Sequence, residues 1–245
     1  GGGSGAGIGP VRIDVQAERL LLLGQRYANT RLKLAPVTGG NRVQVEGNGI
    51  SGNLDIPNAD GATVTGRFSR AAFALARPAG GGARQASTAA AADSDVDPAR
   101  VPPLDIAVQE LRLNGNVLGS ATLRTQPTVA GMQIQALQVR APQQTIDMQG
   151  SWTGRGASAQ TRLQAQLRSE DFGALATRMG LAGQVAKGRG AVDLSLGWPG
   201  APSDFALTGL QGGLSMNVRD GQLVELEPGA GRVLGLLSVA RRPQR

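Results

Sequence analysis

The sequence predicts a mainly β protein. Short segments alternate apolar and polar residues with a period of two, which is typical of strands that bury one face. Turn residues separate these segments, with 37 Gly and 13 Pro among 245 residues. Helical periodicity is confined to short stretches near 169–181 and 228–239. Many short antiparallel strands with glycine turns indicate a sandwich, a barrel or an elongated rolled sheet.

The first strand region covers residues 1–76 and begins with a glycine-rich lead-in over residues 1–10. A continuous apolar run over residues 20–23 indicates a more buried strand. Elsewhere in the region the apolar positions alternate with polar ones; they are Val11, Ile13, Val15, Leu32, Leu34, Val43, Val45, Ile50, Leu54, Ile56, Val64 and Phe68.

Residues 77–103 interrupt the alternation. The segment combines a glycine run from Gly80, an alanine run, three aspartates and several prolines, among them Pro102 and Pro103. Such a composition buries too little apolar surface to fold by itself. We therefore expect a disordered linker or loop between two strand regions, 1–76 and 104–245.

Strands resume at Leu104, and Asn114-Gly115 predicts a hairpin turn because both residues tolerate positive φ. The clearest alternation comes at Leu163, Ala165 and Leu167. It returns later in the region at Val192, Leu194, Leu196, Trp198, Leu214, Met216 and Val218. Asp220-Gly221 predicts a second hairpin turn.

Two helices are expected in this region. Ser169 is the predicted N-cap of the helix over 169–181, with acidic residues in the first turn, where the helix dipole favours them. Its apolar stripe comprises Phe172, Leu175, Ala176 and Met179. Pro228 suits the first position of the second helix, over 228–239.

The composition argues against catalysis. The chain has no Cys and no His, so it lacks disulfides, thiolate metal ligands and the commonest general base. No nucleophile elbow, phosphate-binding loop or calcium loop is present, so we expect no enzyme activity, no metal site and no cofactor. The net charge is +7, but the arginines are scattered and aromatic residues make up only 3%, which disfavours nucleic-acid binding.

No apolar run reaches the roughly 18–20 residues of a membrane span. The sequence begins at Gly1 without a signal peptide or an initiating Met and stops at Arg245. We expect a fragment whose anchoring segment lies outside these residues.

The remaining candidate site is the aliphatic face itself. It is either an ordinary sandwich core or the apolar floor of an open groove that holds a lipid chain. In the second case the predicted lining residues are Leu163, Leu167, Val192, Leu194, Leu196, Leu214, Met216 and Val218, which alternate strictly with polar neighbours.

Six segments of the chain carry a family resemblance; they are 169–175, 194–205, 210–215 and 220–237, with 111–115 and 148–152 as further strand and turn units. These segments resemble the YhdP family of AsmA-like envelope proteins. The resemblance is strongest from about 104 to 240, as in the C-terminal part of the family. It implies an elongated, twisted, mostly antiparallel sheet that is curled into a hydrophobic groove, as in bridge-like lipid-transfer proteins.

The resemblance also implies a function and a place in the cell. The expected role is that of a periplasm-spanning conduit segment that assists phospholipid transport between the inner and outer membranes of a Gram-negative envelope. Its partners would be phospholipid acyl chains and other envelope proteins, and the full-length protein would be anchored in the inner membrane. The alternative is a structural or interaction module with a barrel-assembly or translocation role of the TamB type.

Overall fold

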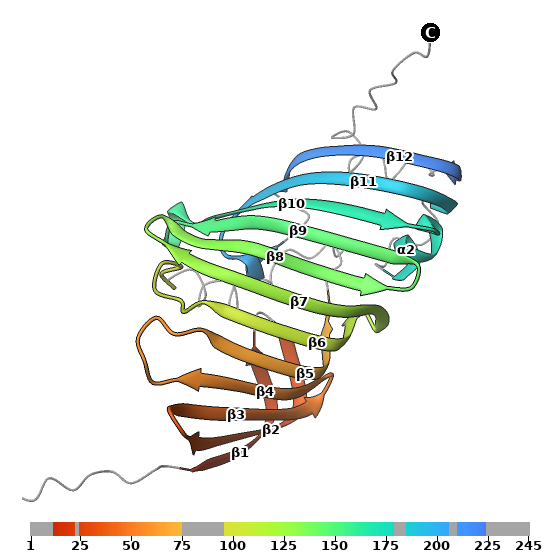
Figure 1. Ribbon diagram of the computed structural model, residues 1–245. Helices are drawn as coiled ribbons and strands as arrows, with labels where there is room; N and C mark the ends of the chain where they lie inside the picture. The colour runs from red at the N-terminus through yellow and green to blue at the C-terminus, as the bar shows by residue number, and fades with distance from the viewer. Residues whose placement is uncertain (1–11, 23–24, 75–95, 179–184, 206–209, 224–245) are drawn as a thin grey trace, which may run out of the picture.

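The computed structural model describes residues 12–22, 25–74, 96–178, 185–205 and 210–223, which form one twisted sheet of twelve strands and one short α-helix (Figure 1). The strands are β1 (Ile13–Leu22), β2 (Gln25–Val37), β3 (Gly40–Asn48), β4 (Ile50–Pro57), β5 (Val64–Phe73), β6 (Leu104–Leu113), β7 (Asn116–Thr128), β8 (Gly131–Ala141), β9 (Gln144–Thr153), β10 (Gln160–Ser169), β11 (Val185–Pro199) and β12 (Gln211–Leu223). Their order in the sheet is their order in the sequence, and the sheet does not close on itself. The predicted fold class, an elongated and mostly antiparallel sheet, is confirmed.

One pair of strands departs from the antiparallel pattern. β5 and β6 run parallel, with Val64 opposite Leu104 and Phe73 opposite Leu113. At the two ends of this pair, the amide of Val64 donates to the carbonyl of Pro103 (2.8 Å), and the amide of Asn114 donates to the carbonyl of Phe73 (2.8 Å). The strands before and after the predicted linker therefore belong to the same sheet.

The predicted linker over 77–103 lies mostly outside the described residues, because the structure describes only 96–103 of it. Within that part the side chain of Pro98 is fully buried. The half-buried Asp97 forms an ion pair with the exposed Arg155, 3.4 Å away, in the loop between β9 and β10. Residues 96–103 thus return the chain to the start of β6 in an ordered conformation.

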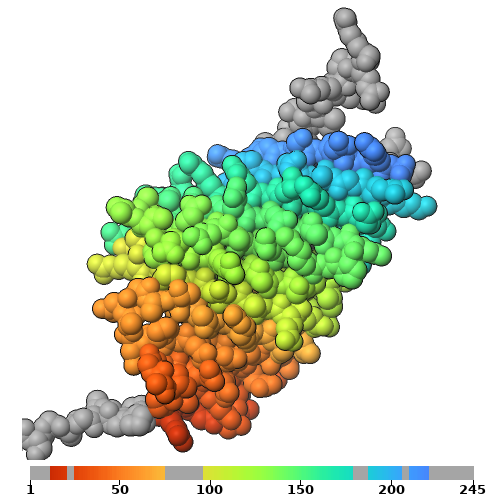
Figure 2. Space-filling view, viewed as in Figure 1, coloured from red at the N-terminus to blue at the C-terminus, as the bar shows by residue number. Residues whose placement is uncertain are grey.

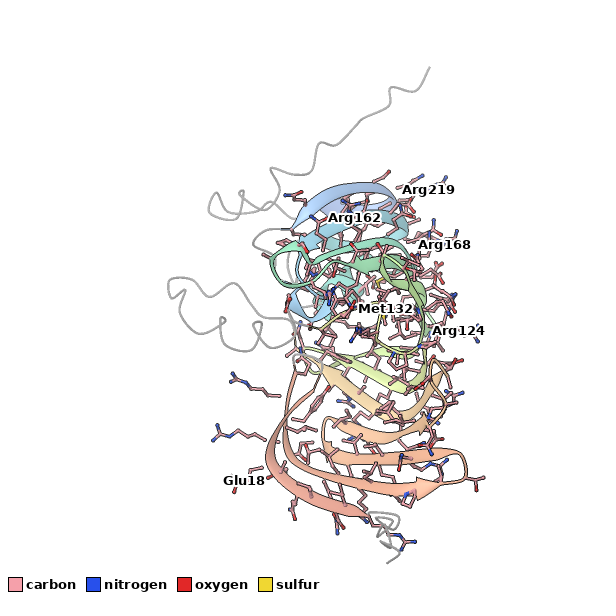
Figure 3. All side chains as sticks on the ribbon, turned by 90° about the vertical axis from the view of Figure 1, so that its left-hand side faces the viewer. Glu18, Arg124, Met132, Arg162, Arg168 and Arg219 are labelled. Atoms are coloured by element: carbon pink, nitrogen blue, oxygen red, sulfur yellow. The ribbon has the colours of Figure 1, made fainter. Side chains whose placement is uncertain are left out.

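The sheet curls so that one face points inward and the other outward. In Figure 3, Met132 lies inside the curl, whereas Arg124, Arg168 and Arg219 point away from it on the outer side. Because successive residues of a strand point to opposite faces, the period-two pattern divides the apolar side chains from the polar ones. Figure 2 shows the outer face of the sheet, which no other described element covers.

The inner face holds two clusters of buried apolar side chains, and Val108 on β6 packs against both. The smaller cluster, on β2–β5, comprises Tyr27, Val45, Ile50 and Phe68. The larger one, from β7 to β11, comprises Leu118, Ala121, Val139, Ile146, Ala165, Leu167, Phe172, Leu175 and Val192. The apolar interior is therefore continuous along the sheet.

The helix predicted over 169–181 is α2 (Phe172–Arg178) in the structure, and residues 179–181 lie outside the described residues. Ser169 was predicted as its N-cap, and this is wrong. Ser169 is the last residue of β10 and pairs with β9 and β11, so its backbone is extended. Asp171 caps the helix instead, because its carboxylate accepts the amide of Ala174 at 2.9 Å.

Of the two predicted hairpin turns, one is confirmed. Asn114 and Gly115 have φ of 50° and 84° and join β6 to β7, as a type I′ turn requires. The turn at Asp220-Gly221 is wrong, because β12 runs through this point and Gly221 pairs with Lys187 of β11. Asp220 has the positive φ of a turn residue (57°), but it uses this conformation inside a strand.

Of the apolar run over residues 20–23, residues 20–22 are the end of β1, and residue 23 lies outside the described residues. The second predicted helix, over 228–239, lies outside the described residues. No helix in the described part of the chain has the length and apolar character that a membrane span needs.

Candidate functional site

An unbroken line of aliphatic residues and one glycine crosses the inner face on all twelve strands. Residues that pair directly across neighbouring strands lie on the same face, so a succession of partners traces one line across the sheet. This line, the central row, consists of Ile13, Leu34, Val43, Leu54, Gly66, Ile106, Leu123, Leu137, Met148, Ala165, Leu194 and Leu214. Neighbouring strands lie about 4.8 Å apart, so the row is about 50 Å long.

Most side chains of the central row are partly accessible to solvent. Its members are half-buried except for Gly66 and Ala165, which are buried, and Ile13, which is 43% exposed. Gly66 occupies its position because a Cβ there would lie 2.6 Å from Cδ1 of Ile106 and 2.9 Å from Cδ2 of Leu54. The small residue lets its two large neighbours keep the apolar surface continuous.

A second row runs beside the first, two residues along each strand. This helix-side row consists of Val15, Leu32, Val45, Gly52, Phe68, Val108, Ala121, Val139, Ile146, Leu167, Val192 and Met216. Its middle is sealed, since Val139 is only 2% exposed and Ile146 and Val192 are 5% exposed. Its two ends are open, at Val15 (46% exposed) and Met216 (48% exposed).

Helix α2 covers the sealed part of the helix-side row. Phe172 and Leu175 pack into the larger cluster, and the helix extends from β11 to β7. Hydrogen bonds hold its last residue, Arg178. The side-chain amide of Asn116 donates to the Arg178 carbonyl (3.3 Å), and the Arg178 guanidinium donates to Oε1 of Gln144 (3.1 Å). The helix is therefore fixed across the inner face at one end of the strands.

Aromatic side chains occupy the inner face near the opposite strand ends. Trp152 and Trp198 flank Thr161 as its cross-strand partners, and all three are buried. The indole N–H of Trp198 donates to the carbonyl of Ala201 (3.0 Å), and its ring meets Phe205 edge-on at 5.2 Å. Between this aromatic cluster and α2 lie the central row and the half-buried pair Leu163 and Leu196.

All eight predicted lining residues lie on the inner face, but their surroundings differ. Leu163, Leu194, Leu196 and Leu214 are half-buried and lie between α2 and the aromatic cluster. Leu167 and Val192 are buried in the cluster that α2 covers, and the half-buried Leu194, Leu214 and Val218 pack against it. Met216 is 48% exposed. Contact of these residues with lipid stays a prediction.

The outer face is polar and carries ion pairs between neighbouring strands. Arg31 lies 2.6 Å from Asp14, and Arg42 lies 2.5 Å from Asp55. Hydrogen bonds from these guanidinium groups hold the pKa values of both aspartates below their ordinary range. All four side chains are at least one-third exposed, so each pair contributes little stability.

A hollow of about 770 Å³ lies on the outer face over β8–β12. Its polar lining residues are Gln135, Gln138, Asp147, Gln149, Gln164, Gln166, Asp193, Ser195 and Ser215. Both aspartates accept hydrogen bonds, Asp147 from Gln138 and Asp193 from Gln166, each at 3.0 Å. The part of the chain that the structure describes has no group of three or more His, Cys, Asp or Glu side chains that could hold a metal ion.

The central row extends well beyond the residues predicted from the sequence. None of its members on β1–β9 was assigned to the site. Alternation along one strand predicts on which face of the sheet a residue lies. Which residue of the next strand lies beside it depends on the register of the two strands. No sequence signal identified this register.

A family model described as YhdP protein matches residues 2–245. No curated protein and no solved structure gives a significant match.

Proposed function

The chain belongs to the YhdP family and is an envelope protein of the AsmA-like group; from this premise we propose that it is a segment of a conduit that carries phospholipid acyl chains between the inner and outer membranes. The route is the central row with its half-buried neighbours Leu163 and Leu196. The proposal includes a position in the periplasm, with an inner-membrane anchor outside residues 1–245, and no catalytic step.

The observation that carries the proposal is the continuity of the central row. Exposing an acyl chain to water costs about 0.8 kcal/mol for each CH₂ group. A surface that is aliphatic at every strand removes much of this cost at every step, so a tail can move along it without an intervening barrier. One leaflet of a bilayer is about 15 Å of hydrocarbon, half of the roughly 30 Å core. A row of about 50 Å therefore accommodates about three tails end to end.

The same surface has no position that would bind an acyl chain much more tightly than its neighbours. Its side chains are aliphatic and donate no hydrogen bonds, so each position along the row binds a methylene group about equally well. The polar groups of a phospholipid would stay outside the curl, because burying them without partners is costly. A conduit for tails needs this combination of weak, repeated contacts.

Photo-crosslinking from neighbouring residues of β11 tests the proposal. Leu194 lies on the central row, whereas the next residue, Ser195, is exposed on the outer face. A photoreactive amino acid at position 194 of the full-length protein in cells should give phospholipid adducts, and the same group at position 195 should not. Folded, expressed protein without a lipid adduct at position 194 would refute the assignment of the row.

Charge substitutions provide a second test with the same matched pair. Leu194→Asp should stop phospholipid movement, because a carboxylate on the central row has to be desolvated each time a tail passes. Ser195→Asp should leave it unchanged. Met216→Asp should act like Leu194→Asp if tails reach β12, since this side chain is 48% exposed on the inner face.

One observation favours the alternative, a structural or interaction module of the envelope. Between β7 and β11, α2 seals the helix-side row as an ordinary core would be sealed. In that case the inner face holds the fold together, and partners bind elsewhere on the protein. Mass spectrometry of lipid extracted from the purified chain separates the two candidates, because only the conduit retains phospholipid.

A further inference from the structure

A second hollow, of about 620 Å³, lies where β9 begins and β10 ends, and it extends over the interior of β11 and β12. Its lining residues are Ala141, Pro142, Gln143, Gln144, Thr145, Arg168, Ser169, Glu170, Arg189, Gly190, Ala191, Asn217 and Arg219. A volume of this size falls within the range of roughly 300–1,000 Å³ that small-molecule sites occupy. The hollow lies mainly on the outer face, and it is more basic than the glutamine-lined hollow over β8–β12.

The cross-strand register explains why the basic side chains meet here. Arg168 of β10 lies opposite Ala191 of β11, which in turn lies opposite Asn217 of β12. Arg219 follows on the same face of β12, two residues further along. On the middle strand, Ala191 lies opposite Arg168 and Arg189 lies opposite Arg219, so three arginines border this region, in which β10 and β12 are about 9.6 Å apart. Figure 3 shows Arg168 and Arg219 on the same side of the sheet.

Neither arginine is neutralised by a carboxylate among the described residues. Many other arginines of the outer face have such a partner, as in the Arg31–Asp14 and Arg42–Asp55 pairs, whereas Arg168 and Arg219 have none. The third arginine of the hollow, Arg189, lies 3.3 Å from Asp220, and both side chains are more than half exposed. An exposed pair of this kind is weak and leaves Arg189 available to a stronger anion.

One acidic side chain, Glu170, opposes this positive charge. The lining carries Arg168, Arg189 and Arg219 against Glu170, a balance of +2, or +1 when the adjacent Asp220 is counted. The negative charge of Glu170 should weaken anion binding. Removing it should therefore strengthen binding, whereas removing an arginine should weaken it.

We propose that this hollow binds a phosphate group through Arg168 and Arg219, and that the phosphate is that of a glycerophospholipid headgroup. Arginine donates two parallel N–H bonds to phosphate oxygens, a geometry that suits phosphate better than a point charge does. Asn217 and Thr145 add an amide and a hydroxyl to the lining. The assignment to a lipid rests on the conduit function proposed above.

The position of the hollow suits a molecule with a polar head and apolar tails. Its lining joins outer-face residues to Gln144 and Ser169, which lie on the inner-face side of the strand ends and are buried beside α2. On β12, the last strand of the sheet, Met216 precedes Asn217 and is 48% exposed on the opposite, inner face. The tails of a headgroup in the hollow would therefore have to reach the inner face around the edge of β12.

The test uses the purified chain and two soluble probes, inorganic phosphate and a short-chain phosphatidylglycerol below its micelle concentration. Binding is followed by NMR, through the backbone amides of residues 168, 191, 217 and 219. The double variant Arg168→Gln/Arg219→Gln should bind the phosphatidylglycerol about tenfold more weakly, as expected for the loss of two charge-assisted contacts. Glu170→Gln should bind it more tightly.

The matched control is Arg26→Gln/Arg162→Gln, which loses the same charge outside the hollow. Arg162 lies on the same strand and face as Arg168, and Arg26 is an exposed residue of β2. This control should bind like the unmodified chain. An equal loss of affinity in both double variants would show that net charge alone attracts the probe, and it would overturn the site.

Leu194→Asp separates this inference from the conduit proposal. If Leu194→Asp weakens phosphatidylglycerol binding and the Arg168/Arg219 variant does not, the conduit stands and the phosphate subsite is refuted. If neither variant changes the affinity, both proposals fail. If inorganic phosphate binds as tightly as the phospholipid and Leu194→Asp has no effect, the hollow is a site for free phosphate, and the lipid assignment is wrong.

Discussion

The difference between sealed and half-open positions on the inner face can be measured on one strand. Leu163 and Leu167 both lie on β10, point to the inner face and have polar neighbours on either side. Leu167 is 7% exposed in the cluster that α2 covers, whereas Leu163 is half-buried and lies opposite Gly150, which offers it no side chain. Substitution of each by Ala removes the same atoms from the same kind of backbone.

The expected costs differ by about 2 kcal/mol. Leu167→Ala leaves a cavity among buried side chains, and such a change in a core costs about 3 kcal/mol. Leu163→Ala removes a side chain that solvent already reaches, so little cavity remains and the cost is about 1 kcal/mol. The difference in strand propensity between Leu and Ala applies equally to both positions and cancels in the comparison.

Urea denaturation of the two variants measures these costs. With a slope of about 2–3 kcal/mol per molar urea, the midpoint of Leu167→Ala should lie about 0.7–1 M below that of Leu163→Ala. Equal midpoints, or a lower midpoint for Leu163→Ala, would refute the reasoning. Either result would mean that the side chain of Leu163 is as fully packed as that of Leu167. The inner face would then have no solvent-accessible apolar surface between α2 and the aromatic cluster.

Three further predictions concern the sheet itself. Gly150→Ala should lower the free energy of unfolding by about 2 kcal/mol in urea denaturation, because the added Cβ would lie 2.1 Å from a backbone carbonyl oxygen of β10. The control is Gly213→Ala, which should be near neutral because no atom lies within 4 Å of the added Cβ. The depressed pKa values of Asp14 and Asp55 stabilise the fold above the pKa values of these groups in the unfolded chain, so the thermal midpoint should fall as the pH drops below about 4. Asp55→Asn should flatten that decline, and an unchanged pH profile would contradict the contribution of this pair. Tyr27→Phe should cost about 1 kcal/mol, since the hydroxyl donates to a backbone carbonyl of β5 at 3.0 Å; a cost near zero in thermal or urea unfolding would show that this bond adds nothing.

Much of the fold follows from the sequence because the strands are local. Period-two alternation identified most strands and the face that each one buries, and Asn114-Gly115 identified a hairpin. The same reasoning failed at Asp220-Gly221, because a residue pair that tolerates positive φ does not have to reverse the chain. It also failed at Ser169, whose pairing within the sheet prevails over its preference for a helix cap.

The candidate site was less predictable than the strands. The sequence placed the eight lining residues on one face, but it could not separate Leu163 from Leu167. That separation depends on where α2 packs, and the packing depends on contacts with β7, far away in the sequence. The parallel pairing of β5 with β6 likewise arises from residues separated by the predicted linker, so no local pattern reports it.

In an open sheet whose strands follow one another in chain order, the geometry does not fix the number of strands. Each additional hairpin would extend the central row by about 10 Å without disturbing the register of the hairpins already present. A closed architecture cannot change in this way, because adding a strand alters its diameter and tilt. Duplication or deletion of short hairpin units can therefore lengthen or shorten such a sheet, while its inner face stays apolar throughout.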